Sequence, residues 1–132
     1  MSSKIGFYAE NIFIGECIKR DIKISKPILD VNGYDFVIEV NNEFKKIQVK
    51  CSGCPPKDNP YSYKVNTFHG SNGDKYTDNH CDFICSYLIE HDIWYIIPIE
   101  KINSKSIRLP HTNISKSKSK YVEYFENWEL LN

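Results

Sequence analysis

The chain has 132 residues, of which 41% are hydrophobic and 14% aromatic, and its formal net charge is zero. This length is typical of a single domain spanning residues 1–132, and this composition is sufficient for a hydrophobic core. A neutral chain is not expected to depend on unspecific attraction to nucleic-acid phosphates.

The sequence predicts neither membrane insertion nor secretion. No apolar segment reaches the roughly 18 residues of a membrane span, and the N-terminus lacks the apolar core of a signal peptide. Five cysteines, an odd number, do not suit a secreted disulfide framework. We therefore expect an intracellular protein, in the cytoplasm or nucleus of its host, with reduced thiols.

The first predicted element is a helix from about Lys4 to Arg20, capped by the serines before it. Its apolar residues form two stripes, which predicts a helix that is buried on two sides. The stripes contain Ile5, Ala9, Ile12 and Phe13, and Phe7, Ile14 and Cys17. Glu10 lies within the second stripe, where an unpaired carboxylate would be strongly unfavourable. It should pair with a lysine such as Lys50 or cap a neighbouring backbone group, unless it has a functional role.

A short strand over residues 21–27 is followed by a predicted β-hairpin over residues 34–50. Two alternating segments flank Asn41-Asn42, and asparagine tolerates the positive φ of a two-residue turn. This turn places Val40 opposite Glu43. It also places Asp35 opposite Gln48, with Lys50 diagonal to Asp35. One face is then largely apolar, formed by Tyr34, Phe36, Ile38, Val40, Ile47 and Val49.

The polar face of the hairpin brings together Asp35, Gln48 and Lys50. Carboxylate and carbonyl oxygens are the ligands that Mg²⁺ prefers, and a lysine can orient water or stabilise charge on a phosphate. These groups are therefore suited to metal-assisted phosphodiester hydrolysis. The same alternation also fits a hairpin with one face turned to solvent.

The rest of the chain predicts further strands and a closing helix. Residues 51–60 contain three prolines and form a loop, residues 61–68 alternate as a strand, and residues 69–79 form a loop that is mobile or lies against a ligand. Strands follow at 81–88, 93–99 and 106–109. Residues 115–131 predict a helix with the apolar stripe Tyr121, Tyr124, Phe125, Trp128 and Leu131. The fold class is α+β, a central mixed sheet flanked by an N-terminal and a C-terminal helix.

Positive charge gathers in residues 101–120, which contain six basic residues and no acidic one. Lys116, Lys118 and Lys120 lie at the start of the predicted last helix. They are candidates for phosphate contacts in DNA, through both charge and the helix N-terminus. A solvated helix start is the alternative.

The cysteines allow a second kind of site. Cys51 and Cys54 have the spacing of a zinc knuckle, and Cys81, Cys85, His69 and His80 follow. However, Cys81 and Cys85 on one extended strand would be about 13 Å apart, so one ion could not bind both. Core packing is the alternative for these cysteines.

Asp35, followed thirteen residues later by Gln48-Val49-Lys50, resembles the metal-binding core of the PD-(D/E)XK nuclease superfamily. The chain is most similar to the group I intron homing endonuclease branch, in which glutamine occupies the second acidic position. The resemblance extends to Gly6, Glu10, Lys26-Pro27, Asp82-Phe83, and residues 94–98 and 124–131. Two departures are that Tyr34 replaces the proline and Gln48 replaces an acid, which removes one negative charge from the metal site.

The resemblance implies a restriction-endonuclease-like α/β core and an Mg²⁺-dependent DNA endonuclease, in which Mn²⁺ can substitute. Asp35 would be the central metal ligand, with Glu10 and Gln48 completing the shell and the Val49 carbonyl adding an oxygen. Lys50 would position or activate the attacking water. Helix-first order would place Glu10 against the sheet face that carries Asp35. Asp82 matches a further acidic residue of the family. It would either have a structural role near the site or cap a turn.

The expected partner is double-stranded or branched DNA. A double-strand cut requires two active sites, so we expect a homodimer or homotetramer, and the homing enzymes that the chain resembles are tetramers. Asp35, Glu10, Gln48 and Lys50 would also serve a restriction-type enzyme or a Holliday junction resolvase. A catalytically silent nuclease-fold module that binds nucleic acid or protein, or a zinc-stabilised module, is the alternative. The abundance of Ile, Asn and Lys suggests an AT-rich genome, such as that of a virus, phage or mobile element.

Overall fold

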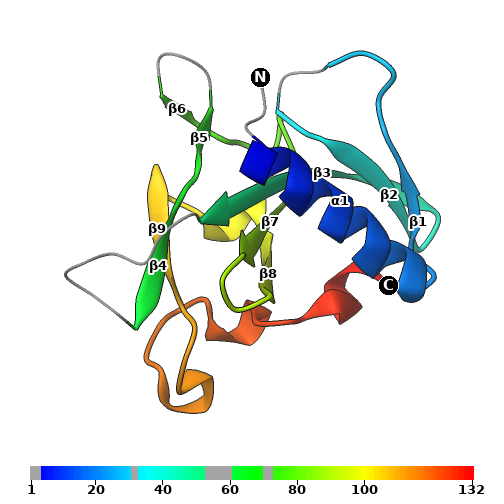
Figure 1. The fold of residues 1–132 in the computed structure, drawn as a ribbon. Coiled ribbons are helices and arrows are strands. Elements are labelled where there is room, and N and C mark those ends of the chain that lie inside the picture. The colour runs from blue at the N-terminus through cyan, green and yellow to red at the C-terminus, as the bar shows by residue number, and fades with distance from the viewer. Residues whose placement is uncertain (1–3, 31–32, 53–60, 70–72) are drawn as a thin grey trace.

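The computed structural model describes residues 4–30, 33–52, 61–69 and 73–132. Its centre is a five-stranded mixed sheet with the order β1-β2-β3-β7-β8 (Figure 1). The strands are β1 (Lys23–Ser25), β2 (Phe36–Val40), β3 (Glu43–Ser52), β7 (Phe83–Leu88) and β8 (Ile93–Pro98). Only the β3–β7 pair is parallel within this sheet. No helix in the described part of the chain is long and apolar enough to cross a membrane.

The predicted hairpin is confirmed in both its turn and its register. Asn41 and Asn42 adopt positive φ values of 51° and 65°, as a two-residue hairpin turn of type I′ requires. Val40 pairs with Glu43 and Phe36 pairs with Ile47. Continuing this register by one residue places Asp35 opposite Gln48.

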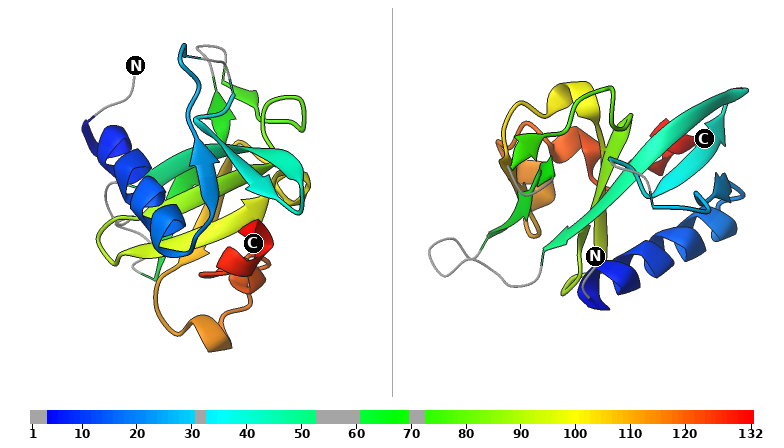
Figure 2. Two further views of the ribbon diagram at one scale, coloured as in Figure 1. Left: turned by 90° about the vertical axis from the view of Figure 1, so that its right-hand side faces the viewer. Right: turned by 90° about the horizontal axis from the view of Figure 1, so that it is seen from above.

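The N-terminal helix α1 (Lys4–Lys19) crosses one face of the sheet (Figures 1 and 2). It buries Ala9, Phe13 and Cys17 in a core that also contains Phe36, Ile38, Ile47, Val49, Trp94 and Ile96. The predicted burial on two sides is wrong, because the sheet covers only one side of α1. Phe7 and Ile18 on the remaining surface are 58% and 66% exposed.

A second layer packs on the opposite face of the sheet. Strands β4 (Ser62–Asn66) and β9 (Ser106–Pro110) form a separate antiparallel pair, and Tyr63 and Leu109 from it join a second core with Ile84, Tyr95 and Ile97. The predicted strand over residues 61–68 is therefore present but pairs outside the central sheet. Strands β5 (Phe68–His69) and β6 (Asp74–Lys75) form a further short pair.

The expected C-terminal helix is wrong. After η1 (Ile99–Lys101), the segment consists of the short 3₁₀ helices η2 (Ile114–Lys116), η3 (Val122–Tyr124) and η4 (Trp128–Leu131). The Ser117 and Ser119 hydroxyls accept backbone hydrogen bonds two residues on, which compete with helical bonds. The apolar residues are buried as expected except Phe125, which is half-buried, but Tyr121 and Tyr124 enter the second core whereas Trp128 and Leu131 enter the first. A single helix face could not serve both cores.

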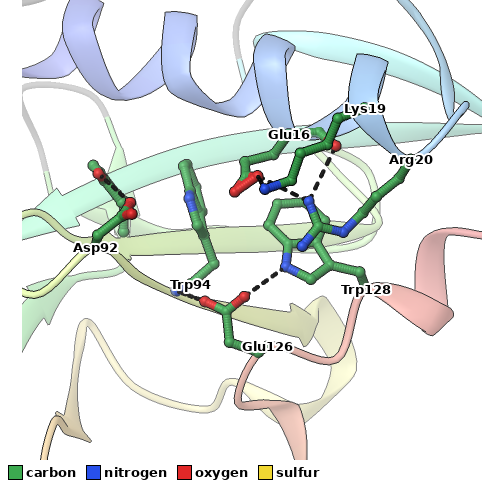
Figure 3. Close-up of polar contacts among 8 residues, drawn as sticks. Glu16, Lys19, Arg20, Asp92, Trp94, Glu126 and Trp128 are labelled. Atoms are coloured by element: carbon green, nitrogen blue, oxygen red, sulfur yellow. Dashed lines mark hydrogen bonds and ion pairs between the residues drawn. The ribbon is translucent and has the colours of Figure 1, made fainter.

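Hydrogen bonds to Glu126 connect the C-terminal segment to the rest of the molecule (Figure 3). Its carboxylate accepts a hydrogen bond from the Trp94 backbone N–H at 2.6 Å and one from the Trp128 indole at 2.9 Å. The Arg20 guanidinium stacks 4.2 Å from the Trp128 ring and pairs with Glu16 at 2.9 Å. These contacts join the end of α1, the C-terminal segment and β8.

Candidate active site

The candidate site lies at the open end of the β2–β3 hairpin, where Asp35 immediately precedes β2. The backbone N–H of Asp35 donates to the Ile47 carbonyl at 2.7 Å, and the backbone N–H of Val49 donates to Asp35 Oδ2 at 2.8 Å. Both the main chain and the side chain of Asp35 are therefore fixed to β3. The register of the hairpin sets the position of its carboxylate.

A pocket of about 240 Å³ brings the Asp35 carboxylate together with Glu10 of α1. The other residues that line it are Phe7, Lys26, Pro27, Leu29, Asp30 and Tyr34. We expected α1 to bring Glu10 against the face that carries Asp35. The helix instead covers the face that carries Phe36, and Glu10 and Asp35 line one pocket at the end of the hairpin.

The Asp35 carboxyl is in an environment that disfavours its negative charge. Burial raises its pKa from 3.8 to about 6, and the Glu10 carboxylate acts in the same direction. The hydrogen bond from Val49 and the charges of Lys50 and Lys26 oppose this shift only in part. A cation held between the two carboxylates would offset both the burial and the repulsion.

The donor set fits a hard divalent cation such as Mg²⁺. Asp35 and Glu10, which both line the pocket, would be its acidic ligands. Among the described residues, no group of three or more His, Cys, Asp or Glu side chains is arranged to hold a metal. Gln48 Nε2 donates to the Val49 carbonyl at 3.2 Å, which places these two neutral oxygen-bearing groups against each other beside Asp35. Mg²⁺ typically binds one or two carboxylates and retains several waters.

Lys50 projects from β3 and is half-buried. Its Nζ donates to the Phe68 carbonyl at 3.4 Å and lies 5.0 Å from the centre of the Tyr76 ring. Burial lowers the pKa of Lys50, and the Asp35 carboxylate partly opposes the shift. A desolvated ammonium of this kind interacts strongly with nearby negative charge and can exchange a proton more readily.

Comparison with known proteins decides the family. The profile of the PD-(D/E)XK endonuclease family matches residues 1–131. The chain belongs to the PD-(D/E)XK endonuclease family. A solved structure described as a bacterial homing endonuclease, I-Ssp6803I, is similar, with 27% sequence identity and a TM-score of 0.77 over 98% of this chain and 91% of that chain. No curated protein matches the chain.

Asp82 has a structural environment. The backbone N–H of Lys46 donates to Asp82 Oδ2 at 2.8 Å, and the N–H of Asp82 donates to the Lys46 carbonyl at 2.8 Å. These bonds extend the β3–β7 pairing by one residue before the start of β7. The geometry favours the capping interpretation of Asp82.

The three C-terminal lysines do not join the candidate site. The expected helix N-terminus is absent, because η2 has only three residues and Lys116 is its last. The segment that contains Lys116 and Lys118 lies at the opposite end of the molecule from the start of β2 (Figures 1 and 2). Lys120 Nζ lies 5.2 Å from the Tyr121 ring.

The cysteines offer no zinc site among the described residues. Cys17, Cys51, Cys81 and Cys85 are free thiols, and burial raises the pKa of each. Cys85 belongs to the first core and Cys81 to the second, as the packing interpretation proposed. Cys54 lies outside the described residues.

Sequence reasoning missed Tyr76, which lies beside Lys50 at the site. It falls in a region predicted to be a loop, and the sequence pattern gives no reason to select this tyrosine. His69 and His80 pack against it with ring centroids 4.8 Å and 6.0 Å away. The expectation that this loop lies against a ligand was the only available signal.

Proposed function

We propose that this PD-(D/E)XK endonuclease hydrolyses DNA phosphodiester bonds with Mg²⁺, or Mn²⁺ in its place, held by Asp35 and Glu10. The observation that carries the proposal is the pocket that the half-buried Asp35, whose carboxyl has a raised pKa, lines together with a second acid, Glu10. Family membership and the similarity to a homing endonuclease support DNA as the substrate.

Each residue has a distinct part in this proposal. Asp35 and Glu10 bind the ion, while the Gln48 amide and the Val49 carbonyl contribute or orient neutral oxygen ligands. The bound ion would act as a Lewis acid on the phosphate. Lys50 orients the attacking water and stabilises the negative charge that develops on the phosphate.

We further propose a homing-endonuclease-like cut in both strands by a homodimer or homotetramer. One chain contributes one Asp35, whereas the two strands of a duplex have opposite polarity. Two sites must therefore be combined in one assembly. The similarity to a bacterial homing endonuclease favours a linear duplex target over a branched one.

The test is cleavage of supercoiled plasmid and of a four-way junction with Mg²⁺ or Mn²⁺. Asp35→Ala and Lys50→Ala should each abolish cutting. Lys45→Ala is the matched control, because Lys45 is on the same strand but pairs with Glu43 at 3.0 Å beside the hairpin turn, at the other end of β3 from Lys50. It should cut as wild type does.

The second candidate function is a catalytically silent module that binds nucleic acid. It is favoured by Gln48, which stands in place of an acid and removes one negative charge from the metal site. It predicts that the wild type binds DNA but cuts neither substrate with either metal. Preference for the junction would instead identify a resolvase. Preference for plasmid would support the homing or restriction type.

A further inference from the structure

The ammonium of Lys50 is held by groups from a separate part of the chain. It donates to the Phe68 carbonyl in β5 at 3.4 Å, and it lies 5.0 Å from the centre of the Tyr76 ring just after β6. The hydrogen bond is longer than the usual N–H···O range, so it is a weak restraint. The face of the tyrosine ring is therefore the main contact that fixes the end of this flexible side chain.

Tyr76 is itself rigidly placed. It is 7% exposed and packs against the imidazoles of His69 and His80, whose own ring centroids are 4.1 Å apart. The His80 ring is anchored by the backbone N–H of Thr77, which donates to Nδ1 at 3.1 Å. We call Tyr76, His69 and His80 the aromatic cluster.

The aromatic cluster also borders the turn that leads to Asp35. Gly33 adopts a φ of +105°, and a Cβ at this position would lie 2.7 Å from the His80 Cβ. Only glycine fits both this conformation and this approach. The same cluster therefore packs on the turn two residues before Asp35 and on the ammonium of Lys50.

We propose that Tyr76 is the positioning residue for Lys50, holding its ammonium over the ring face where Lys50 acts in phosphodiester hydrolysis. The proposal rests on the nuclease function proposed above. The Tyr76 ring contacts the ammonium of Lys50, so its effect on hydrolysis passes through the lysine. The ring face, and not the phenolic hydroxyl, is the part that matters.

Two substitutions of Tyr76 distinguish the effect of its aromatic ring face from the effect of its apolar volume. Tyr76→Phe retains the ring face and should keep kcat within about twofold of wild type, whereas Tyr76→Leu retains an apolar side chain without a π face and should lower kcat by about tenfold. KM for DNA should not change, because the lysine acts on the reacting phosphate and contributes little to binding of the long duplex. Equal losses in both variants would overturn the proposal, as would wild-type kcat in a folded Tyr76→Leu protein.

A nuclear magnetic resonance measurement tests the contact without relying on activity. The ε-methylene protons of Lys50 should be shifted upfield by the ring current of Tyr76 in the wild type and in Tyr76→Phe. They should move to ordinary positions in Tyr76→Leu, or in Tyr76→Met if the leucine variant does not fold. An unshifted resonance in the wild type would overturn the proposal. A shifted resonance in a wild type that cuts no DNA would count against the nuclease and not against this contact.

Discussion

At the residue scale, the half-buried carboxyl of Asp35 makes the metal-free protein less stable at neutral pH. Its pKa is about 6 in the folded protein, against a usual value of 3.8. Below about pH 4 the group is protonated in both the folded and unfolded states, and the penalty is absent. The penalty grows as pH rises and is complete above about pH 6, where a shift of this size corresponds to about 2–3 kcal/mol.

Asp35→Asn should therefore raise the free energy of unfolding by about 2 kcal/mol at pH 7.5, with little change at pH 4. The amide oxygen can still accept the Val49 N–H, so the hydrogen bond at 2.8 Å is retained. Urea unfolding in EDTA at the two pH values measures the difference. Equal stability of the two proteins at pH 7.5 would contradict the burial of this charge.

Glu10 is the residue that distinguishes a metal pocket from a single buried acid. Glu10→Gln keeps the shape and removes one of two negative charges, so Mn²⁺ affinity should fall by about tenfold or more. Isothermal titration calorimetry with MnCl₂ measures this directly. Glu16→Gln is the matched control on the same helix, because Glu16 pairs with Lys19 and Arg20 away from the pocket. A similar loss in both variants would indicate a non-specific effect of charge.

At the element scale, the hairpin could be predicted because all of its determinants are local. The Asn41-Asn42 turn and the alternating strands together fix the register, and the register places Asp35, Gln48 and Lys50. The C-terminal segment could not be predicted in this way. Its apolar spacing matches a helix, but those residues fill two cores on opposite faces of the sheet.

The Glu126 contacts should be essential to that segment. Glu126→Ala removes acceptors for the Trp94 N–H and the Trp128 indole, and we expect a loss of about 2 kcal/mol in the free energy of unfolding. Chemical denaturation monitored by tryptophan fluorescence measures the loss. Glu129→Ala, an exposed acid three residues later, should leave stability unchanged. A loss below about 0.5 kcal/mol in Glu126→Ala would show that other contacts hold the segment.

At the scale of the whole molecule, the site combines residues with different degrees of predictability. Asp35 and Lys50 lie on one hairpin, so the pattern alone brings them together. Glu10 comes from another element and required the family resemblance. Tyr76 reaches Lys50 only through the packing of the β5–β6 segment, which is a tertiary arrangement that no local pattern specifies.

A double-strand cut by an assembly with one site per chain predicts a defined behaviour of mixed oligomers. Wild-type and Asp35→Ala chains with different tags, co-expressed and purified through both tags, should contain active and inactive sites in one particle. Such particles should nick supercoiled plasmid and accumulate open circles, whereas the wild type should give linear DNA. Recovery of no doubly tagged particle would contradict a homo-oligomer. Linear product at the wild-type rate would mean that one intact site cuts both strands, because the Asp35→Ala chain lacks the central carboxylate of the pocket.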